Sequence, residues 1–294
     1  MTRLLVGTDD GLLDGDGKRL LDGRVNALSH DGWAVIDAAT VMRANTPDTW
    51  VDAATLPRAH RSEHRPLLSQ GTSAIVGNGD GLLRVGSDGE VEPLVGFRDI
   101  AGREEWHAVG SAQPYVRSLT ATADGVLLAN VHVGGIPRST DGGDSWEATI
   151  DVDADVHEVR AHAERPALVF AAAAVGFGIS RDAGATWDVH TAGLHATYCR
   201  AVASTGDSVL VSASTGPFTD RAAVYRRAIE ESGPFEQVSD WLPHNIDTEC
   251  LAADGDDVAF GGSDGRLHRS RDGGRTWTAS GGFPPITALA YARK

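Results

Sequence analysis

Short apolar runs, bounded by glycine and aspartate, recur along the chain and predict a protein built from β-strands. In several places one apolar run is followed by a glycine-containing turn and then by a second short run. The clearest pairs are 126–129 with 134–136, 168–171 with 176–179, and 258–261 with 265–267. Runs this short are typical of strands rather than helices.

A second pattern marks the innermost strand of each repeated unit, with an apolar residue, two further positions and then Leu or Val. It occurs at 25–28, 116–119, 156–159, 199–202, 248–251 and 286–289. The last copy has no outer strands after it, whereas the chain begins with outer strands at 4–7 and 11–13. We therefore expect residues 4–6 to pair with 286–291, which leaves no free sheet edge.

An eight-residue motif, Ser-x-Asp-x-Gly-x-(Ser/Thr)-Trp, occurs three times, at 139–146, 180–187 and 270–277. Its tryptophans are 41 and 90 residues apart, so one degenerate copy is expected between the second and the third. The Asp can accept hydrogen bonds from amides of the turn that follows, and the Gly can adopt a positive φ. The Trp can cover apolar surface.

This motif resembles the Asp-box, or bacterial neuraminidase repeat, found in sialidases and in other propellers, including those similar to photosystem II assembly factors. The resemblance implies that each motif joins the outer strands of a blade, far from the axial channel. Its Asp and Trp residues are then poor candidates for an active site. The repeat length, with four short strands in each unit, is also the signature of a β-propeller blade.

The repeats predict an all-β, seven-bladed β-propeller that occupies residues 1–294 as a single domain. The blade shared by the two ends is joined by units near 24–60, 61–104, 105–150, 151–195, 196–245 and 246–283. The unit at 61–104 has no clear inner strand, and six blades are the alternative.

The net charge of −15 and the pI of about 5.0 argue against nucleic acid or an anionic membrane as a general partner. The chain has no apolar run of membrane-spanning length and no signal-peptide pattern, so we expect a cytoplasmic protein. In that compartment Cys199 and Cys250 are expected to be buried free thiols. The sequence does not indicate an oligomeric state.

Polar residues gather where the predicted inner strands face the axis. Because alternate residues of a strand share a face, we examine the same two positions in each unit. They hold Arg24 and Asn26, Tyr115 and Arg117, Asp155 and His157, Tyr198 and Arg200, Asp247 and Glu249, and Pro285 and Thr287. We expect a polar axial cavity, in which Arg117, Arg200, His157 and Glu249 form one site.

The residue types in this set suggest particular roles. Arg117 and Arg200 can hold a carboxylate or phosphate, with Tyr115, Asn26 and His132 as further ligand-binding residues. The candidate catalytic or metal-ligating residues are His157, Glu249, Asp155, Asp247 and Tyr198. The alternative is that these charges only pair with one another around buried water.

Two classes of function follow, and the sequence leaves open whether the protein is an enzyme. One is a pocket for a small anionic ligand, with hydrolase or lyase activity on an acidic sugar or related metabolite. The other is a non-catalytic assembly or scaffold propeller that binds a protein partner. The Phe/Tyr-Arg-Ile-Pro motif of sialidases and a third arginine are absent, and seven blades differ from their six. No motif indicates a cofactor.

Overall fold

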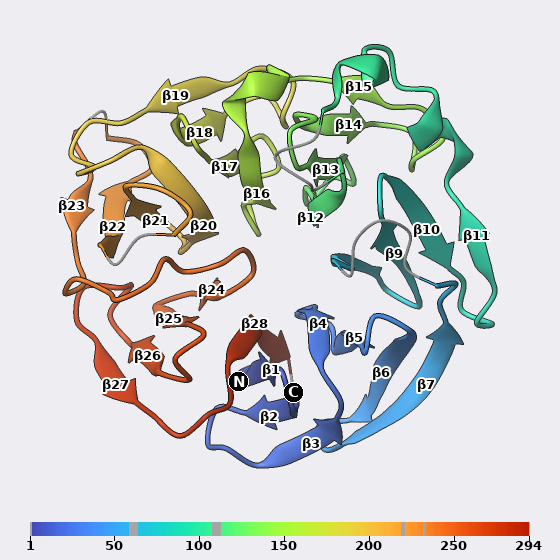
Figure 1. The fold of residues 1–294 in the computed structure, drawn as a ribbon, viewed down its shortest axis with the longest axis horizontal. Coiled ribbons are helices and arrows are strands. Elements are labelled where there is room, and N and C mark those ends of the chain that lie inside the picture. Colours follow the sequence, from blue (N-terminus) through green and yellow to red (C-terminus); the bar gives the residue numbers. More distant parts are fainter. Residues whose placement is uncertain (1, 59–63, 108–112, 219–220, 232, 294) are drawn as a thin grey trace.

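The computed structural model describes residues 2–58, 64–107, 113–218, 221–231 and 233–293. In this part of the chain, seven four-stranded antiparallel sheets form a ring around a central axis (Figure 1). We call the sheets blades and give their strands from the axis outward. The predicted seven-bladed β-propeller is therefore confirmed, and the six-bladed alternative is wrong.

The bounds of the strands follow the predicted units. Blade 1 is β28 (Ile286–Arg293), β1 (Thr2–Thr8), β2 (Gly11–Asp14) and β3 (Arg19–Asp22); blade 2 is β4 (Val25–Leu28), β5 (Trp33–Ile36), β6 (Thr40–Thr46) and β7 (Thr49–Thr55); blade 3 is β8 (Leu67–Gln70), β9 (Ser73–Asn78), β10 (Gly81–Val85) and β11 (Val91–Pro93). Blade 4 is β12 (Val116–Ala121), β13 (Leu127–Val131), β14 (Pro137–Ser139) and β15 (Glu147–Ala148); blade 5 is β16 (Val156–Ala161), β17 (Val169–Ala173), β18 (Gly176–Ser180) and β19 (Asp188–His190). Blade 6 is β20 (Tyr198–Ser204), β21 (Ser208–Ser214), β22 (Ala222–Ala228) and β23 (Glu236–Gln237); blade 7 is β24 (Leu251–Asp254), β25 (Asp257–Gly261), β26 (Leu267–Ser270) and β27 (Thr278–Ser280).

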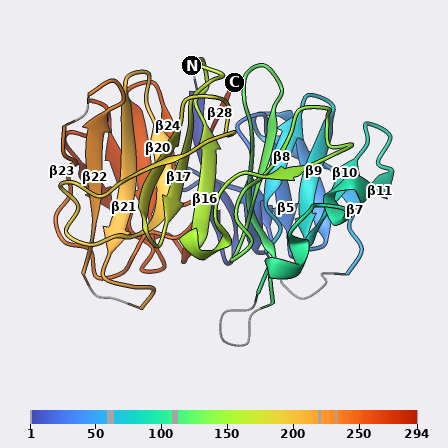
Figure 2. The same ribbon diagram turned by 90° about the horizontal axis from the view of Figure 1, so that it is seen from above.

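Blade 1 closes the ring with strands from both ends of the chain. β28 pairs antiparallel with β1 in the register Leu4↔Tyr291 and Val6↔Leu289, as the sequence predicts. Both termini lie at one face of the ring (Figure 2), so β28 begins at the opposite face. The innermost strand of the closing blade therefore comes from the C-terminus, and its next strand from the N-terminus.

The apolar cores lie between neighbouring blades. Strands β5, β17 and β21 are buried at every residue because another blade covers each of their faces. This explains why the sequences of these strands are continuously apolar and do not alternate between apolar and polar residues. One core cluster, for example, joins Phe260 of blade 7 to Val224 of blade 6 and Leu289 of blade 1.

Two sequence expectations need correction. Blade 3 has an inner strand, β8, whose segment Leu67–Gln70 ends in polar residues and lacks the apolar spacing of the other copies. In blade 7 the inner strand starts only at Leu251, because Thr248 and Glu249 form a turn before it.

The helices of the described ranges are short 3₁₀ turns: η1 (Val95–Arg98), η2 (Arg103–Glu105) and η3 (Val152–Ala154). None of them has the length and apolarity to cross a membrane.

Five inner strands carry a β-bulge close to their first residue. At each bulge the inner strand has one more residue than the second strand with which it pairs. This extra residue is Asn26 in β4, Arg117 in β12, His157 in β16 and Thr287 in β28. In β20 the bulge includes Arg200 and Ala201. A bulge breaks the two-residue alternation and redirects a side chain. In each of these five blades, one of the two residues predicted to face the axis is thus on a bulge.

Candidate functional site

A polar cavity of about 520 Å³ lies at the face of the ring where the inner strands begin. Its lining includes Asn26, Arg117, Asp247, Glu249 and Thr287, which come from blades 2, 4, 7 and 1. A second cavity of about 600 Å³ lies on the side of blades 6 and 7, and its lining includes Arg200. Asp247 lines both cavities.

Arg117 and Arg200 converge on the carboxylate of Asp247. Oδ1 of Asp247 lies 2.6 Å from Nη2 of Arg200 and 3.1 Å from Nη2 of Arg117, and it also accepts a hydrogen bond from the Thr248 amide at 2.8 Å. The two arginines lower the pKa of Asp247, although burial acts to raise it. Two guanidinium groups therefore face one carboxylate.

Arg117 is held more tightly than Arg200. Its side chain is 5 % exposed, and its Nε donates to Oγ1 of Thr248 at 2.9 Å, whereas the side chain of Arg200 is 18 % exposed. The side chain of Asp247 is 53 % exposed to the cavities. The centre is therefore accessible from the cavity side while its arginines are fixed in direction.

A second group contains His132, Asp155 and His157. Nε2 of His132 lies 3.6 Å from Oδ1 of Asp155, and Nε2 of His157 lies 3.5 Å from Oδ2. Burial lowers the pKa of both histidines, that of His132 to about 4, and the charge of Arg117 acts in the same direction. Both rings are therefore neutral at pH 7.

Aromatic rings join this group to its surroundings. The ring of His64 stacks on that of Tyr115, with 4.7 Å between the ring centroids. The centroid of the Tyr115 ring lies 5.1 Å from that of His132, and the centroid of the Tyr198 ring lies 4.6 Å from that of His157. Burial raises the pKa of both tyrosines, so both are neutral at pH 7. The phenol rings thus support the two imidazoles from either side.

Glu249 belongs to a third, deeper group. Glu158 of β16 is fully buried; it accepts hydrogen bonds from Nε of Arg160 and from the amides of Val202 and Glu249. Burial raises the pKa of Glu249 to about 8, while the charge of Arg160 opposes this shift. Glu158 therefore connects blade 5 to blades 6 and 7 beneath the cavity.

The structure brings together some of the four residues expected to form one site and separates the others. Arg117 and Arg200 meet at Asp247, but His157 is completely buried and its Nδ1 donates to the carbonyl of Cys199 at 2.6 Å. Glu249 is 9 % exposed and lies near Glu158 and Arg160. The bulges and the turn at 248–249 separate these side chains, which simple strand alternation would have placed together.

The other predicted residues line or flank the cavity. Oδ1 of Asn26 accepts a hydrogen bond from the Ala38 amide at 2.6 Å, and Tyr115 and Tyr198 contact the histidines. Sequence reasoning missed Thr248, Glu158 and Arg160. The charged residues of β16 were the available signal, because a charge inside a predicted inner strand requires a partner.

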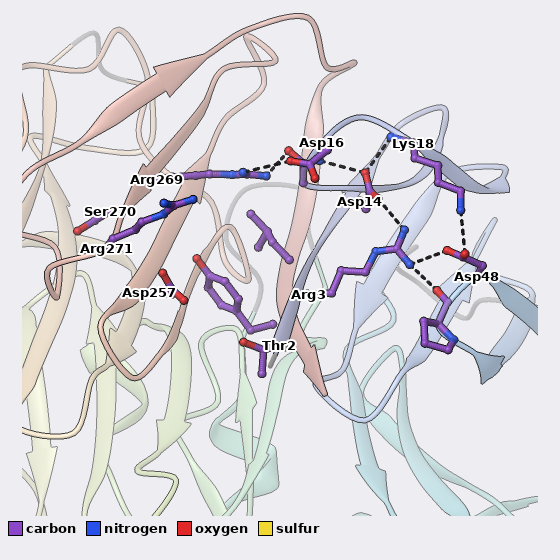
Figure 3. Close-up of a pocket in the computed structure, with 14 residues that line it drawn as sticks. Thr2, Arg3, Asp14, Asp16, Lys18, Asp48, Asp257, Arg269, Ser270 and Arg271 are labelled. Carbon is purple, nitrogen blue, oxygen red and sulfur yellow. Dashed lines mark hydrogen bonds and ion pairs between the residues drawn. The ribbon is translucent and has the colours of Figure 1, made fainter. Parts of the chain in front are cut away.

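A further cavity, of about 850 Å³, lies at the other face of the ring, beside the first residues of β1 and the end of β28. Figure 3 shows Arg3 between Asp14 and Asp48, with nitrogen–oxygen distances of 2.6 and 2.8 Å, and Lys18 beside Asp48 at 2.8 Å. These charges pair with one another across the blade 1–blade 2 boundary. We therefore assign this cavity a structural role and place the candidate site at the other face.

Fold and site together define a seven-bladed β-propeller with a charged axial cavity. No family model and no curated protein matches the sequence. Solved structures do resemble it. The structure described as YCF48 bound to D1 peptide is 16% identical with a TM-score of 0.58, covering 94% of this chain and 84% of that one. The WD40 β-propeller domain of Doa1 is 12% identical with a TM-score of 0.62, covering 95% and 85%.

A larger enzyme shares the fold as well. The GH74 enzyme of Niastella koreensis is 15% identical with a TM-score of 0.59, and the match covers 95% of this chain but 47% of that one. This chain thus corresponds to about half the length of that enzyme. At such identities these similarities support the fold alone, and the fold serves both catalytic and non-catalytic proteins.

Proposed function

We propose that the protein binds an anionic group, such as a carboxylate, at Arg117 and Arg200, beside the Asp247 carboxylate that lines both cavities. The observation that carries this proposal is the convergence of two guanidinium groups from blades 4 and 6 on a single oxygen of Asp247. Guanidinium groups match carboxylates geometrically, so this pair can bind an anionic group of a ligand. The two cavities that share Asp247, of about 520 and 600 Å³, each have the size of a small-molecule site.

A protein partner is the second candidate source of that anion, and exposed apolar residues favour it. Pro217, Phe218 and Pro243 line the cavity that contains Arg200, and Phe218 is fully exposed. An apolar rim beside a charged centre suits a peptide with an acidic and an apolar residue. The similar propeller YCF48 was solved bound to a peptide, which agrees with this alternative.

Catalysis stays a prediction for this chain. Asp247 is ionised and Glu249, with a pKa of about 8, is largely protonated at pH 7, a difference that an acid–base pair requires. However, Asp247 is held by two arginines and Glu249 is largely buried. We therefore propose binding rather than hydrolase or lyase activity.

Titration calorimetry would test the proposal. Acetate, succinate and glucuronate represent small anions, glucose is the neutral comparison, and a short acidic peptide with one phenylalanine represents the protein source. Arg200→Gln should weaken anion binding by about 2–5 kcal/mol, because the substitution removes a paired charge from a partly buried site. Arg165→Gln is the matched control, since Arg165 pairs with Glu230 at 2.6 Å outside both cavities.

The outcomes separate the alternatives. Binding of the small anions alone indicates a metabolite site, whereas binding of the peptide alone, weakened also by Phe218→Ala, indicates a protein partner. Equal affinities of Arg200→Gln and Arg165→Gln for every ligand that binds would contradict the proposal.

A further inference from the structure

Three potential metal ligands from blades 4 and 5 lie together beside the axial cavity. His132 is in the turn after β13, Asp155 directly precedes β16, and His157 is on the bulge of β16. One donor atom of each residue lies within 4.8 Å of the other two. Within the described ranges, this is the one such group of His, Cys, Asp or Glu side chains.

The distances in this group suit ligands of a shared ion better than hydrogen-bonded partners. The two nitrogen–oxygen separations are 3.5 and 3.6 Å, beyond the usual limit of about 3.2 Å for a hydrogen bond. Two ligands at about 2.1 Å from one ion are separated by about 3.0–3.5 Å. Oδ1 of Asp155 and Nε2 of His157 are also buried without a hydrogen-bond partner, an arrangement that costs free energy unless another group compensates.

The hydrogen-bond partner of His157 determines which of its ring nitrogens carries a hydrogen. Its Nδ1 lies 2.6 Å from the carbonyl oxygen of Cys199, and a carbonyl can only accept, so Nδ1 carries the hydrogen. Nε2 is then the ring nitrogen that faces the carboxylate of Asp155, at 3.5 Å from Oδ2. A carbonyl partner on the second ring nitrogen is also the usual arrangement of a metal-bound histidine.

The backbone fixes the ligands before any ion binds. Asp155 has a left-handed conformation (φ 48°, ψ 67°), held by hydrogen bonds from its amide to Val152 and from the Ala174 amide to its carbonyl. The amide of His132 donates to the carbonyl of Tyr115 at 2.9 Å. A left-handed aspartate is an unusual conformation that surrounding contacts must enforce.

We propose that His132, Asp155 and His157 bind a divalent transition-metal ion, with Zn²⁺ as the representative. Two imidazole nitrogens and one carboxylate oxygen form a donor set that suits zinc and its neighbours rather than calcium or magnesium. Three protein ligands leave at least one coordination position for water or for an anion. Arg117 is close enough for its charge to act on both histidines, so it would also attract an anion bound to the metal.

The test is titration of Zn²⁺ into protein that has been treated with EDTA and dialysed, at pH 7 and without added carboxylate. We expect one Zn²⁺ per chain and a higher melting temperature in its presence. Asp155→Asn and His132→Gln should each weaken binding by about 100-fold or more, since they remove a direct ligand. Melting curves recorded without metal show whether each variant folds. If one of the two variants does not fold, the other is used to test the proposal.

His30→Gln is the matched control, because His30 also lies beside a carboxylate, Asp31 at 3.2 Å, but on the exposed surface. It should bind Zn²⁺ with wild-type affinity. Absence of stoichiometric binding by the wild type, or equal binding by the wild type and both ligand variants, would overturn the proposal. The titration uses no organic anion, and anion binding can be measured on the dialysed, metal-free protein, so failure of one proposal is distinguishable from failure of the other.

Discussion

Asp247 is the residue on which the charged centre depends. Its Oδ1 receives two guanidinium groups and one backbone amide, so it sets the position of side chains from three blades. The carboxylate of Glu158 likewise accepts hydrogen bonds from the amides of Val202 and Glu249, which belong to two other blades. Buried carboxylates that accept several hydrogen bonds are thus the means by which separate blades are fixed around the axis.

Glu249 should make the stability of the protein depend on pH. Its pKa is raised to about 8 in the folded state from an ordinary value of 4.5, so its contribution is complete below pH 4.5 and is lost as the pH rises through 8. We expect wild-type protein to lose on the order of 3 kcal/mol from this residue between those limits. Glu249→Gln, which cannot titrate, should remove that loss.

The measurement is urea unfolding at pH 5 and pH 8. The difference in unfolding free energy between the two pH values should be smaller for Glu249→Gln than for the wild type. An identical pH dependence would show that Glu249 is ionised in the folded protein.

At the scale of elements, the repeated motif forms the turn between the third and fourth strands of blades 4, 5 and 7. In each copy the Asp accepts from the amide and the hydroxyl of the Ser or Thr four residues later, as in Asp182 with Thr186 at 2.8 and 2.6 Å. The glycine two residues after the Asp packs against the preceding blade; Gly184 faces Leu128, and Gly274 faces Leu210. The motif therefore joins neighbouring blades as well as strands.

Gly184→Ala should destabilise the fold through this contact. Gly184 has a φ of +84°, and a Cβ there would clash with Cδ2 of Leu128. We expect a loss of about 1–3 kcal/mol in urea unfolding. Gly142→Ala is the control, because its φ is also positive, nothing lies within 4 Å, and Ala183 occupies the same motif position in blade 5. Equal losses in the two variants would contradict a packing role.

The tryptophans of the motif differ in burial, although their sequence positions match. Trp146 is 9 % exposed, donates to the carbonyl of Gly143 and packs edge-on against Phe97 at 5.0 Å, whereas Trp187 is only partly buried. Trp146→Ala should therefore cost about 3–5 kcal/mol in unfolding free energy, and Trp187→Ala clearly less. Zn²⁺ affinity should stay unchanged in both; a selective loss of that affinity would indicate that the motif shapes the site.

At the scale of the whole molecule, stability depends on closure of the ring. β28 covers β1 over its full length and buries Ile286 and Leu289 beside blade 7. Because blade 1 lies between blades 2 and 7, its inner strand also contacts β4 and β24. Loss of this strand would expose a sheet edge and two inter-blade surfaces at once.

Deletion of residues 284–294 should lower the melting temperature sharply. Leu289→Ala, a smaller change in the same strand, should cost about 2–5 kcal/mol, and it remains informative if the truncated chain does not fold. Melting temperatures equal to that of the full-length protein in both variants would mean that the ring does not need this closure.

The sequence predicts the ring better than it predicts the site. Blade number and closure follow from the spacing of Trp146, Trp187 and Trp277 and from the unpaired strands at each end, since these signals are local and repeated. The position of His157 depends on a bulge, and the approach of His132 to Asp155 depends on a turn and a left-handed residue. Such features follow from tertiary contacts between blades, which strand alternation does not encode.

The most direct test of the axial anion site is anomalous diffraction from crystals soaked in bromide. Bromide probes an anion site without knowledge of the natural ligand. An anomalous peak within hydrogen-bonding distance of Arg117 and Arg200, absent in Arg200→Gln crystals, is the predicted result. Peaks at surface arginines such as Arg165, with none in the cavity beside Asp247, would contradict the account.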